Sequence, residues 1–128
     1  MANYKDSPTW LKAMELATEV ADVTRILAKA NGMPVRETAR DDYNRAAQEI
    51  PMDIAEAKIL ENSPRECLQF VKKAQGDVAR FETRLLLDVR RGYVQQSHVD
   101  KALRLCEELG ALILAAIEKL EAEERTAR

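Results

Sequence analysis

Apolar residues recur at intervals of three and four along most of the chain, which is the spacing of one face of an α-helix. The stretch from Arg45 to Ala57 shows this pattern, with Ile50 and Ile54 on the apolar face and Pro51 between them. A proline inside a helix removes one backbone hydrogen bond and crowds the carbonyl group four residues before it. We therefore expect a buried helix that bends at Pro51.

Two sequence signals predict helix starts elsewhere. Ser7-Pro8 and Ser63-Pro64 each place a serine that can cap a helix before a proline at the first helical position. Glu66 stands three residues after Ser63, where a glutamate can bond back to the backbone and complete a capping box. These positions predict the beginnings of the first and third helices.

The helix ends are marked by residues that tolerate or force a break. Asn31-Gly32 with Pro34 predicts the end of the first helix, and Gly92 that of the third. The segment 97–100 has the residues of a helix cap. Together the signals predict helices at residues 8–30, 35–60, 64–91 and 98–122, with a charged tail at 121–128 that frays.

The third predicted helix has the most regular pattern, because its apolar steps alternate between four and three as in a heptad repeat. The repeat comprises Cys67, Val71, Ala74, Val78, Phe81 and Leu85. Four helices of similar length with short connections are typical of an antiparallel bundle. We predict an all-α protein, an antiparallel up-down-up-down four-helix bundle forming one domain over residues 1–128.

Composition restricts the possible functions. The chain has 128 residues and a net charge of −2, and its pI is near 5.5, which argues against a strongly basic nucleic-acid-binding domain. Cys67 and Cys106 lack the spacing of a metal or redox site, so we expect inert packing in a reducing compartment. No signal peptide is evident, and the longest apolar run, 109–117, is too short to cross a membrane. We expect a cytoplasmic protein that does not bind membranes.

That apolar run surrounds the fourth helix on every side, more than one core stripe requires. Helices that are apolar all round are buried, so we predict an oligomer interface that also uses apolar residues of the third helix. The candidate interface residues are Leu86, Leu87, Leu112, Leu114 and Ala115. The alternative is that this part of the fourth helix is simply a very apolar core helix.

Basic residues also share one side of the third helix, at spacings of seven, four and seven. They are Lys73, Arg80, Arg84 and Arg91. A stripe of this kind can contact nucleic-acid phosphates and release their counterions. The alternative is an ordinary solvated face, because Asp77 and Asp88 stand three or four residues from these cations, where helix ion pairs form.

No residues predict catalysis, a cofactor or a metal. Di-metal sites in four-helix bundles use Glu-x-x-His motifs, and the chain has none. Its remaining glutamate candidates would form only an all-carboxylate site: Glu15, Glu19, Glu56 and Glu82. His98, the only histidine, is expected at the surface or in a cap, and Asp53 and Glu56 are expected to cap or to pair with Arg45 or a neighbouring subunit. No small-molecule substrate is evident.

Several motifs resemble those of a known family. The opening Tyr4-Lys5-Asp6 with Trp10 is similar to its Tyr-Lys-Asp-Leu-x-Val-Trp start. The motif residues Arg45, Ile50, Pro51, Ile54 and Glu56 match its pattern Arg-Arg-Ala-Ala-x-Ser-Ile-Pro-Ser-Asn-Ile-Ala-Glu-Gly. On these motifs the chain resembles the small bacterial four-helix-bundle proteins related to those encoded in intervening sequences of 23S ribosomal RNA genes.

The resemblance implies a homopentameric ring of bundles and no catalytic residues. A relative, the accessory variability determinant of diversity-generating retroelements, binds a reverse transcriptase and its RNA through a basic surface. We therefore expect a non-enzymatic homo-oligomeric binding or scaffold protein. The alternatives are an RNA-binding accessory of a reverse transcriptase and, more distantly, a di-metal carboxylate enzyme. Glu49 and Asp53 replace neutral polar residues of the family motif, so we expect a subunit or partner contact beside Pro51.

Overall fold

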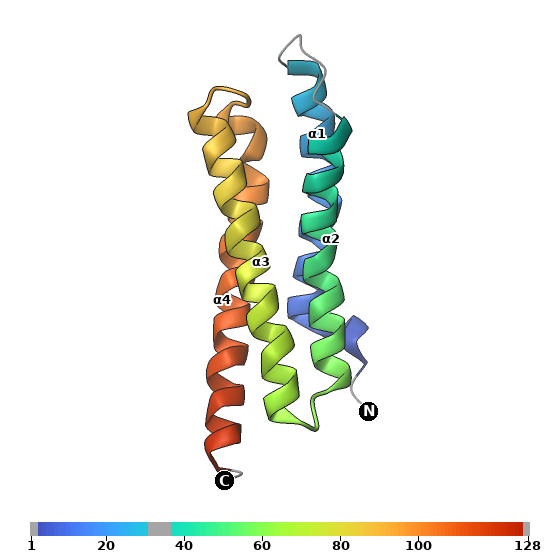
Figure 1. Ribbon diagram of the computed structural model, residues 1–128, viewed down its shortest axis with the longest axis vertical. Coiled ribbons are helices and arrows are strands. Elements are labelled where there is room, and N and C mark those ends of the chain that lie inside the picture. The colour runs from blue at the N-terminus through green and yellow to red at the C-terminus, as the bar shows by residue number, and fades with distance from the viewer. Residues whose placement is uncertain (1–2, 31–36, 127–128) are drawn as a thin grey trace.

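The computed structural model describes residues 3–30 and 37–126. Its elements are a short 3-10 turn, η1 (Tyr4–Asp6), and the helices α1 (Pro8–Ala30), α2 (Glu37–Ile59), α3 (Pro64–Arg90) and α4 (Gln96–Thr126). The helices lie lengthwise beside one another (Figure 1), each packed on the next, with α1 also packed on α4. The all-α prediction is confirmed, and this packing is that of an up-down bundle.

The boundaries of α4 differ most from those predicted. The helix begins at Gln96, whose side-chain amide donates to Asp100 at 3.1 Å, and it continues to Thr126 instead of fraying from residue 121. The final turns are rich in Ala, Glu, Lys and Arg, which favour helices, and Glu121 pairs with Lys72 of α3 at 3.9 Å. The predicted stop at 31–34 and start at 35 lie outside the described residues.

Only some of the predicted caps form. The Ser7 hydroxyl accepts a bond from the Trp10 backbone N–H at 3.4 Å, so that cap is confirmed. Ser63 makes no side-chain capping bond, and the capping box with Glu66 is therefore wrong. Gly92 ends α3 with φ of +77°, a backbone conformation that glycine adopts without steric penalty.

The end of α3 has the two hydrogen bonds of a Schellman motif. The Tyr93 N–H donates to the Asp88 carbonyl and the Gly92 N–H donates to the Val89 carbonyl, both at 3.0 Å. These bonds satisfy carbonyl groups that the end of a helix would otherwise leave without partners. The chain is thereby turned into the short connection that leads to α4.

The core runs along the axis of the bundle and receives side chains from all four helices. Every position of the predicted heptad repeat in α3 is buried, and its largest side chain, Phe81, is 1% exposed. Cys67 and Cys106 are also buried as free thiols, in agreement with inert packing. Helix α2 continues through Pro51, which is buried, and the predicted bend stays a prediction.

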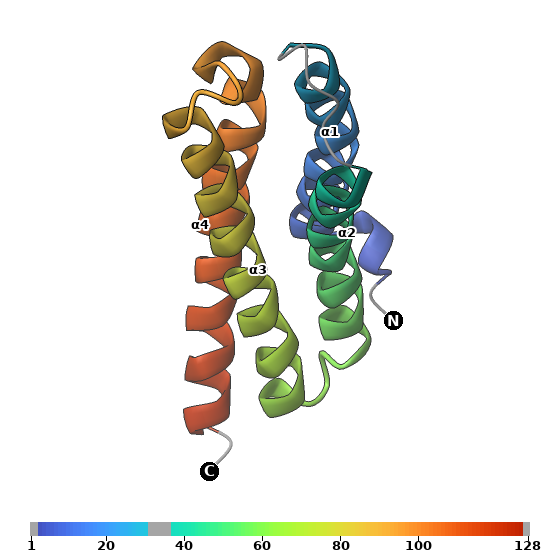
Figure 2. The same cartoon turned by 45° about the horizontal axis from the view of Figure 1, so that its top comes forward.

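The two ends of the bundle are built differently. Figure 2 shows α1 beside α2 and α3 beside α4 as two antiparallel pairs. At the lower end of Figure 1, α1 begins part of the way up, whereas α2, α3 and α4 reach further down. Within the described residues no helix is both long enough and apolar enough to cross a membrane.

Candidate functional site

Helices α2 and α3 are joined by a group of four charged side chains that we call the Lys73 cluster: Lys73, Glu49, Asp53 and Asp77. Glu49 and Asp53 lie one turn apart on α2, and Lys73 and Asp77 one turn apart on α3. The Lys73 ammonium donates to both Asp53 oxygens at 3.1 and 2.9 Å and to Glu49 at 3.2 Å. Its nitrogen lies 3.7 Å from the nearest Asp77 oxygen. One cation is therefore shared by three carboxylates.

Burial makes this cluster electrostatically unusual. Asp53 is only 6% exposed, and within the described part of the chain the buried Asp77 Oδ2 has no hydrogen-bond partner. Burial and the neighbouring Asp53 raise the pKa of Asp77 to about 6, although Lys73 opposes the shift. The hydrogen bond to Asp53 is the main cause of a raised pKa for Lys73. Asp77 is thus the group in the cluster that takes up a proton under mildly acidic conditions.

The same carboxylates are the described acidic residues that best match a metal site. One oxygen from each of Glu49, Asp53 and Asp77 lies within 4.8 Å of the others, and hard cations such as Mg²⁺ and Ca²⁺ prefer carboxylate oxygens. The Lys73 ammonium, however, already lies between them at hydrogen-bond distance from two of the three groups. The arrangement therefore suits charge neutralisation between helices better than metal binding.

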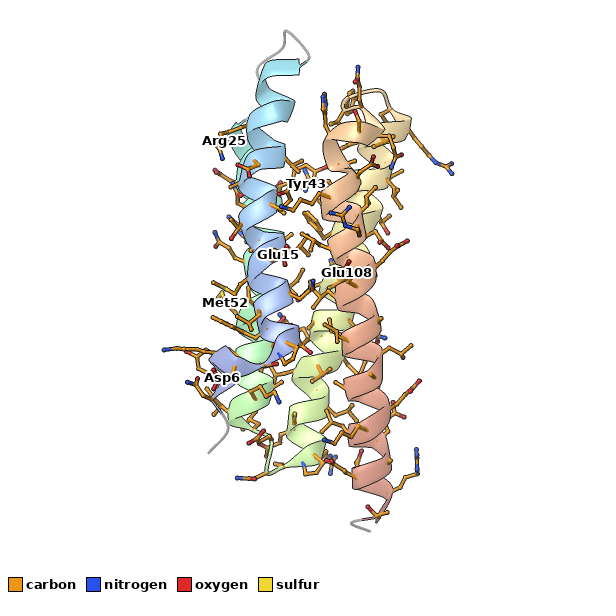
Figure 3. The ribbon with its side chains drawn as sticks, turned by 180° about the vertical axis from the view of Figure 1, so that it is seen from behind. Asp6, Glu15, Arg25, Tyr43, Met52 and Glu108 are labelled. Atoms are coloured by element: carbon orange, nitrogen blue, oxygen red, sulfur yellow. The ribbon has the colours of Figure 1, made fainter. Side chains whose placement is uncertain are left out.

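A second polar contact joins α2 and α3 nearer the other end of the bundle. The Tyr43 hydroxyl donates to the Asp88 carboxylate, and the Arg84 guanidinium lies over the Tyr43 ring, 4.4 Å from its centroid. Figure 3 shows Tyr43 pointing from its helix toward the α3–α4 pair. Burial and the bond to Asp88 raise the pKa of Tyr43, so the phenol remains a neutral donor. Hydrogen bonding and stacking thus fix Tyr43 against α3.

These contacts use most of the predicted basic stripe. Lys73 bonds to the α2 carboxylates, Arg84 stacks on Tyr43, and Arg91 lies 4.0 Å from Asp88. Among the described residues, Arg80 alone of the four makes no ion pair, hydrogen bond or ring contact, and it is exposed. The ion pairs within α3 that the alternative predicted are present at Lys73–Asp77 and Arg91–Asp88.

The family-like segment of α2 mainly supplies core and helix contacts. Ile50 and Ile54 point into the core, and Pro51, which stands between them in the sequence, is also buried. Arg45 and Glu56 are exposed. Within the described residues Asp53 forms its salt bridge with Lys73 rather than with Arg45, and the expected contact with a neighbouring subunit stays a prediction. Sequence patterns could place Asp53 and Lys73 on facing helices, but not at the same height.

The predicted interface residues divide into separate surfaces. Leu86, Leu87 and Leu114 are 42–48% exposed, Ala115 is exposed and Leu112 is half-buried. Lys72 of α3 pairs with Glu121 of α4 on the outside of the bundle, so these two residues mark the positions where the exposed sides of α3 and α4 meet. We call this line of contact the outer α3–α4 groove. Leu86 stands two heptads after Lys72, and Leu114 one heptad before Glu121, so both lie along that groove. Ala115 stands one heptad after Glu108, which pairs with Lys12 of α1 at 2.8 Å (Figure 3).

The glutamates weighed for an all-carboxylate metal site are not brought together in the described chain. Glu15 and Glu19 lie near lysines instead, with Lys12 at 3.7 Å and Lys101 at 3.5 Å respectively. Glu56 is exposed on α2, and Glu82 on α3 is half-buried. His98 is half-buried near the start of α4, and its enclosed Nδ1 has no hydrogen-bond partner among the described residues.

Comparison with known proteins gives one match. The model of the family described as 23S rRNA-intervening sequence protein matches residues 5–115, a span that begins in η1 and ends in α4. No curated protein and no solved structure shows significant similarity to the chain. The matched span includes the Lys73 cluster, Tyr43 and Leu114.

Proposed function

This chain belongs to the 23S rRNA-intervening sequence protein family, and we propose that it acts without catalysis, as a homo-oligomeric binding or scaffold protein. The main support is its distribution of exposed apolar side chains over two separate surfaces. The first surface, which we call the α3–α4 face, comprises Leu86 and Leu114. The second, which we call the α1–α2 face, comprises Leu11, Met14, Met52 and Ile59.

Two different apolar surfaces favour a ring over a simple dimer. A two-fold dimer needs only one self-complementary patch, whereas a closed ring joins one patch of each copy to a different patch of the next. Figure 3 shows Met52 on the outer side of the α1–α2 pair, away from α3 and α4. We propose that the α3–α4 face of one copy packs on the α1–α2 face of the next, and that five copies close the ring.

A charge placed on either face should dissociate the ring. We expect wild-type protein to form a particle several times the 14.5 kDa chain mass, and Leu114→Glu or Met52→Glu to be monomeric in light scattering at micromolar concentration. Burying a leucine contributes about 1.5–3 kcal/mol per interface, and a glutamate there is both desolvated and unpaired. Ala122→Glu is the control, because Ala122 is exposed in the last turns of α4.

Mixing the two variants tests the head-to-tail arrangement. Leu114→Glu retains the α1–α2 face and Met52→Glu retains the α3–α4 face, so one productive interface remains between them. An equimolar mixture should form a heterodimer and nothing larger. A monomeric wild-type protein would contradict the proposal, as would a Leu114→Glu variant with unchanged mass.

RNA binding is the second candidate function, and the free guanidinium of Arg80 favours it. Arg80 lies on α3 beside exposed Thr83 and Leu87, and a ring would repeat this cation once in every subunit. We expect Arg80→Glu to weaken retention of single-stranded RNA on a filter at low salt and to reduce the slope of log K against log salt by about 0.7 per lost phosphate contact. Arg65→Glu, at another exposed arginine of α3, serves as the control. Equal retention by wild-type protein and both variants would contradict RNA binding at Arg80.

A further inference from the structure

A cavity of about 350 Å³ opens at the lower end of the bundle. It lies where α1 begins part of the way up the bundle while the other three helices continue (Figures 1 and 3). The first residues of α1, including Thr9, form one side, and α2, α3 and α4 form the rest. The cavity therefore occupies the position that a longer α1 would fill.

Apolar side chains line the interior of this cavity, Ser7, Thr9 and Asn62 add polar groups to its wall, and four charged side chains border it. Ile54, Ala57, Val71 and Ile113 line the interior, and all four are buried. The mouth carries two lysines and two glutamates: Lys58, Lys119, Glu61 and Glu123. Because their formal charges cancel, the mouth favours neither an anionic nor a cationic head group.

Size limits what can enter. An apolar cavity of about 150 Å³ can hold a benzene molecule, so this one can hold a bicyclic aromatic molecule or a medium-length alkyl chain. We propose that this end cavity is a binding site for a small, uncharged hydrophobic molecule.

Cys67 provides a reporter inside the proposed site. Its side chain lines the cavity, whereas Cys106 lies in the core and is absent from the lining. Burial raises the pKa of both thiols, that of Cys106 to about 12 with a further contribution from Glu82, so both should react slowly with maleimides and Cys106 the more slowly. A ligand in the cavity should cover Cys67 and leave Cys106 unchanged.

The first test is titration with 1-naphthylamine, an uncharged bicyclic probe whose fluorescence shifts in apolar surroundings. We expect saturable binding of one probe per chain and displacement by naphthalene or 1-octanol. Ala116→Leu, which places extra carbons at the cavity wall, should weaken binding by about tenfold or more. Ala122→Leu, on an exposed part of the same helix, should leave binding unchanged. Leu114→Glu should also bind normally, which separates this site from the proposed subunit interface.

The second test uses wild-type protein, so its result does not depend on whether the Ala116→Leu variant folds. Naphthalene should slow N-ethylmaleimide modification of Cys67, measured by peptide mass spectrometry, without changing the rate at Cys106. Absence of saturable probe binding would overturn the proposal. It would also be overturned if naphthalene slowed both cysteines equally, or if Leu114→Glu abolished binding.

Discussion

Replacing Lys73 with methionine is expected to lower the free energy of unfolding by about 2 kcal/mol at pH 7.5. The substitution keeps an unbranched apolar stem but removes the only cation among three carboxylates whose oxygens lie within 4.8 Å of one another. Breaking a fully buried ion pair costs about 3–5 kcal/mol. Lys73 is 51% exposed, and solvent screening reduces the loss below that range.

The loss should shrink in mild acid. The folded-state pKa of Asp77 is about 6, above its ordinary value of 3.8, so the folded protein binds more protons than the unfolded chain between these pH values. The stability associated with Asp77 is therefore greatest below pH 3.8 and is lost as pH rises through about 6. Without Lys73, the ionised carboxylates repel one another more strongly. The free energy of unfolding of Lys73→Met should therefore fall more steeply with rising pH than that of the wild-type protein.

Urea denaturation followed by circular dichroism at pH 5 and pH 7.5 measures both effects, at one fixed protein concentration because assembly would itself add stability. Asp77→Asn removes the titrating group, so the free energy of unfolding of this variant should differ less between pH 5 and pH 7.5. Lys101→Met is the matched control, since Lys101 has a single partner, Glu19, at 3.5 Å, and such a pair contributes less than about 1 kcal/mol. Equal losses for Lys73→Met and Lys101→Met would show that the shared cation has no special role.

The fold was predictable because each helix has local signals that need no knowledge of its neighbours. The heptad repeat correctly predicted which side of α3 is buried, and Gly92 correctly predicted where α3 ends. Local signals failed where two options were close in energy. At Ser63 the proline at the first helical position suffices to start α3 without a capping box, and in the C-terminal tail a contact with Lys72 supports helix that composition alone left uncertain.

The candidate sites were much less predictable because they depend on the relative heights of helices. Lys73 was assigned to an outward basic stripe, but a lysine near the edge of the α2–α3 contact can turn toward Glu49 and Asp53 once the two helices are in register. The acidic residues that replace neutral ones in the family motif, Glu49 and Asp53, both accept hydrogen bonds from Lys73 of the same chain, and the predicted contact with a subunit or partner stays a prediction. The end cavity had no sequence signal, because it arises from where α1 begins relative to three other helices.

Replacing Phe81 with alanine is expected to have the largest effect on stability, a loss of about 3–5 kcal/mol. Phe81 is 1% exposed at the centre of the core, and truncation leaves a void that surrounding helices can fill only partly. Its ring also meets Tyr43 edge to face, with centroids 6.0 Å apart and planes at 87°. Leu87→Ala, on the exposed side of the same helix, is the control for helix propensity, measured in the monomeric Leu114→Glu background.

Phe81→Leu separates the void from the ring contact. Leucine retains much of the volume, so the loss should fall to about 1.5 kcal/mol, of which roughly 0.5–1.5 kcal/mol reflects the aromatic pair. A double-mutant cycle with Tyr43→Leu isolates that part. Because Tyr43 is also held by Asp88 and stacked by Arg84, a coupling energy near zero would mean that those polar contacts alone position the phenol. A coupling near 1 kcal/mol would mean that the core ring and the polar contacts hold α2 on α3 together.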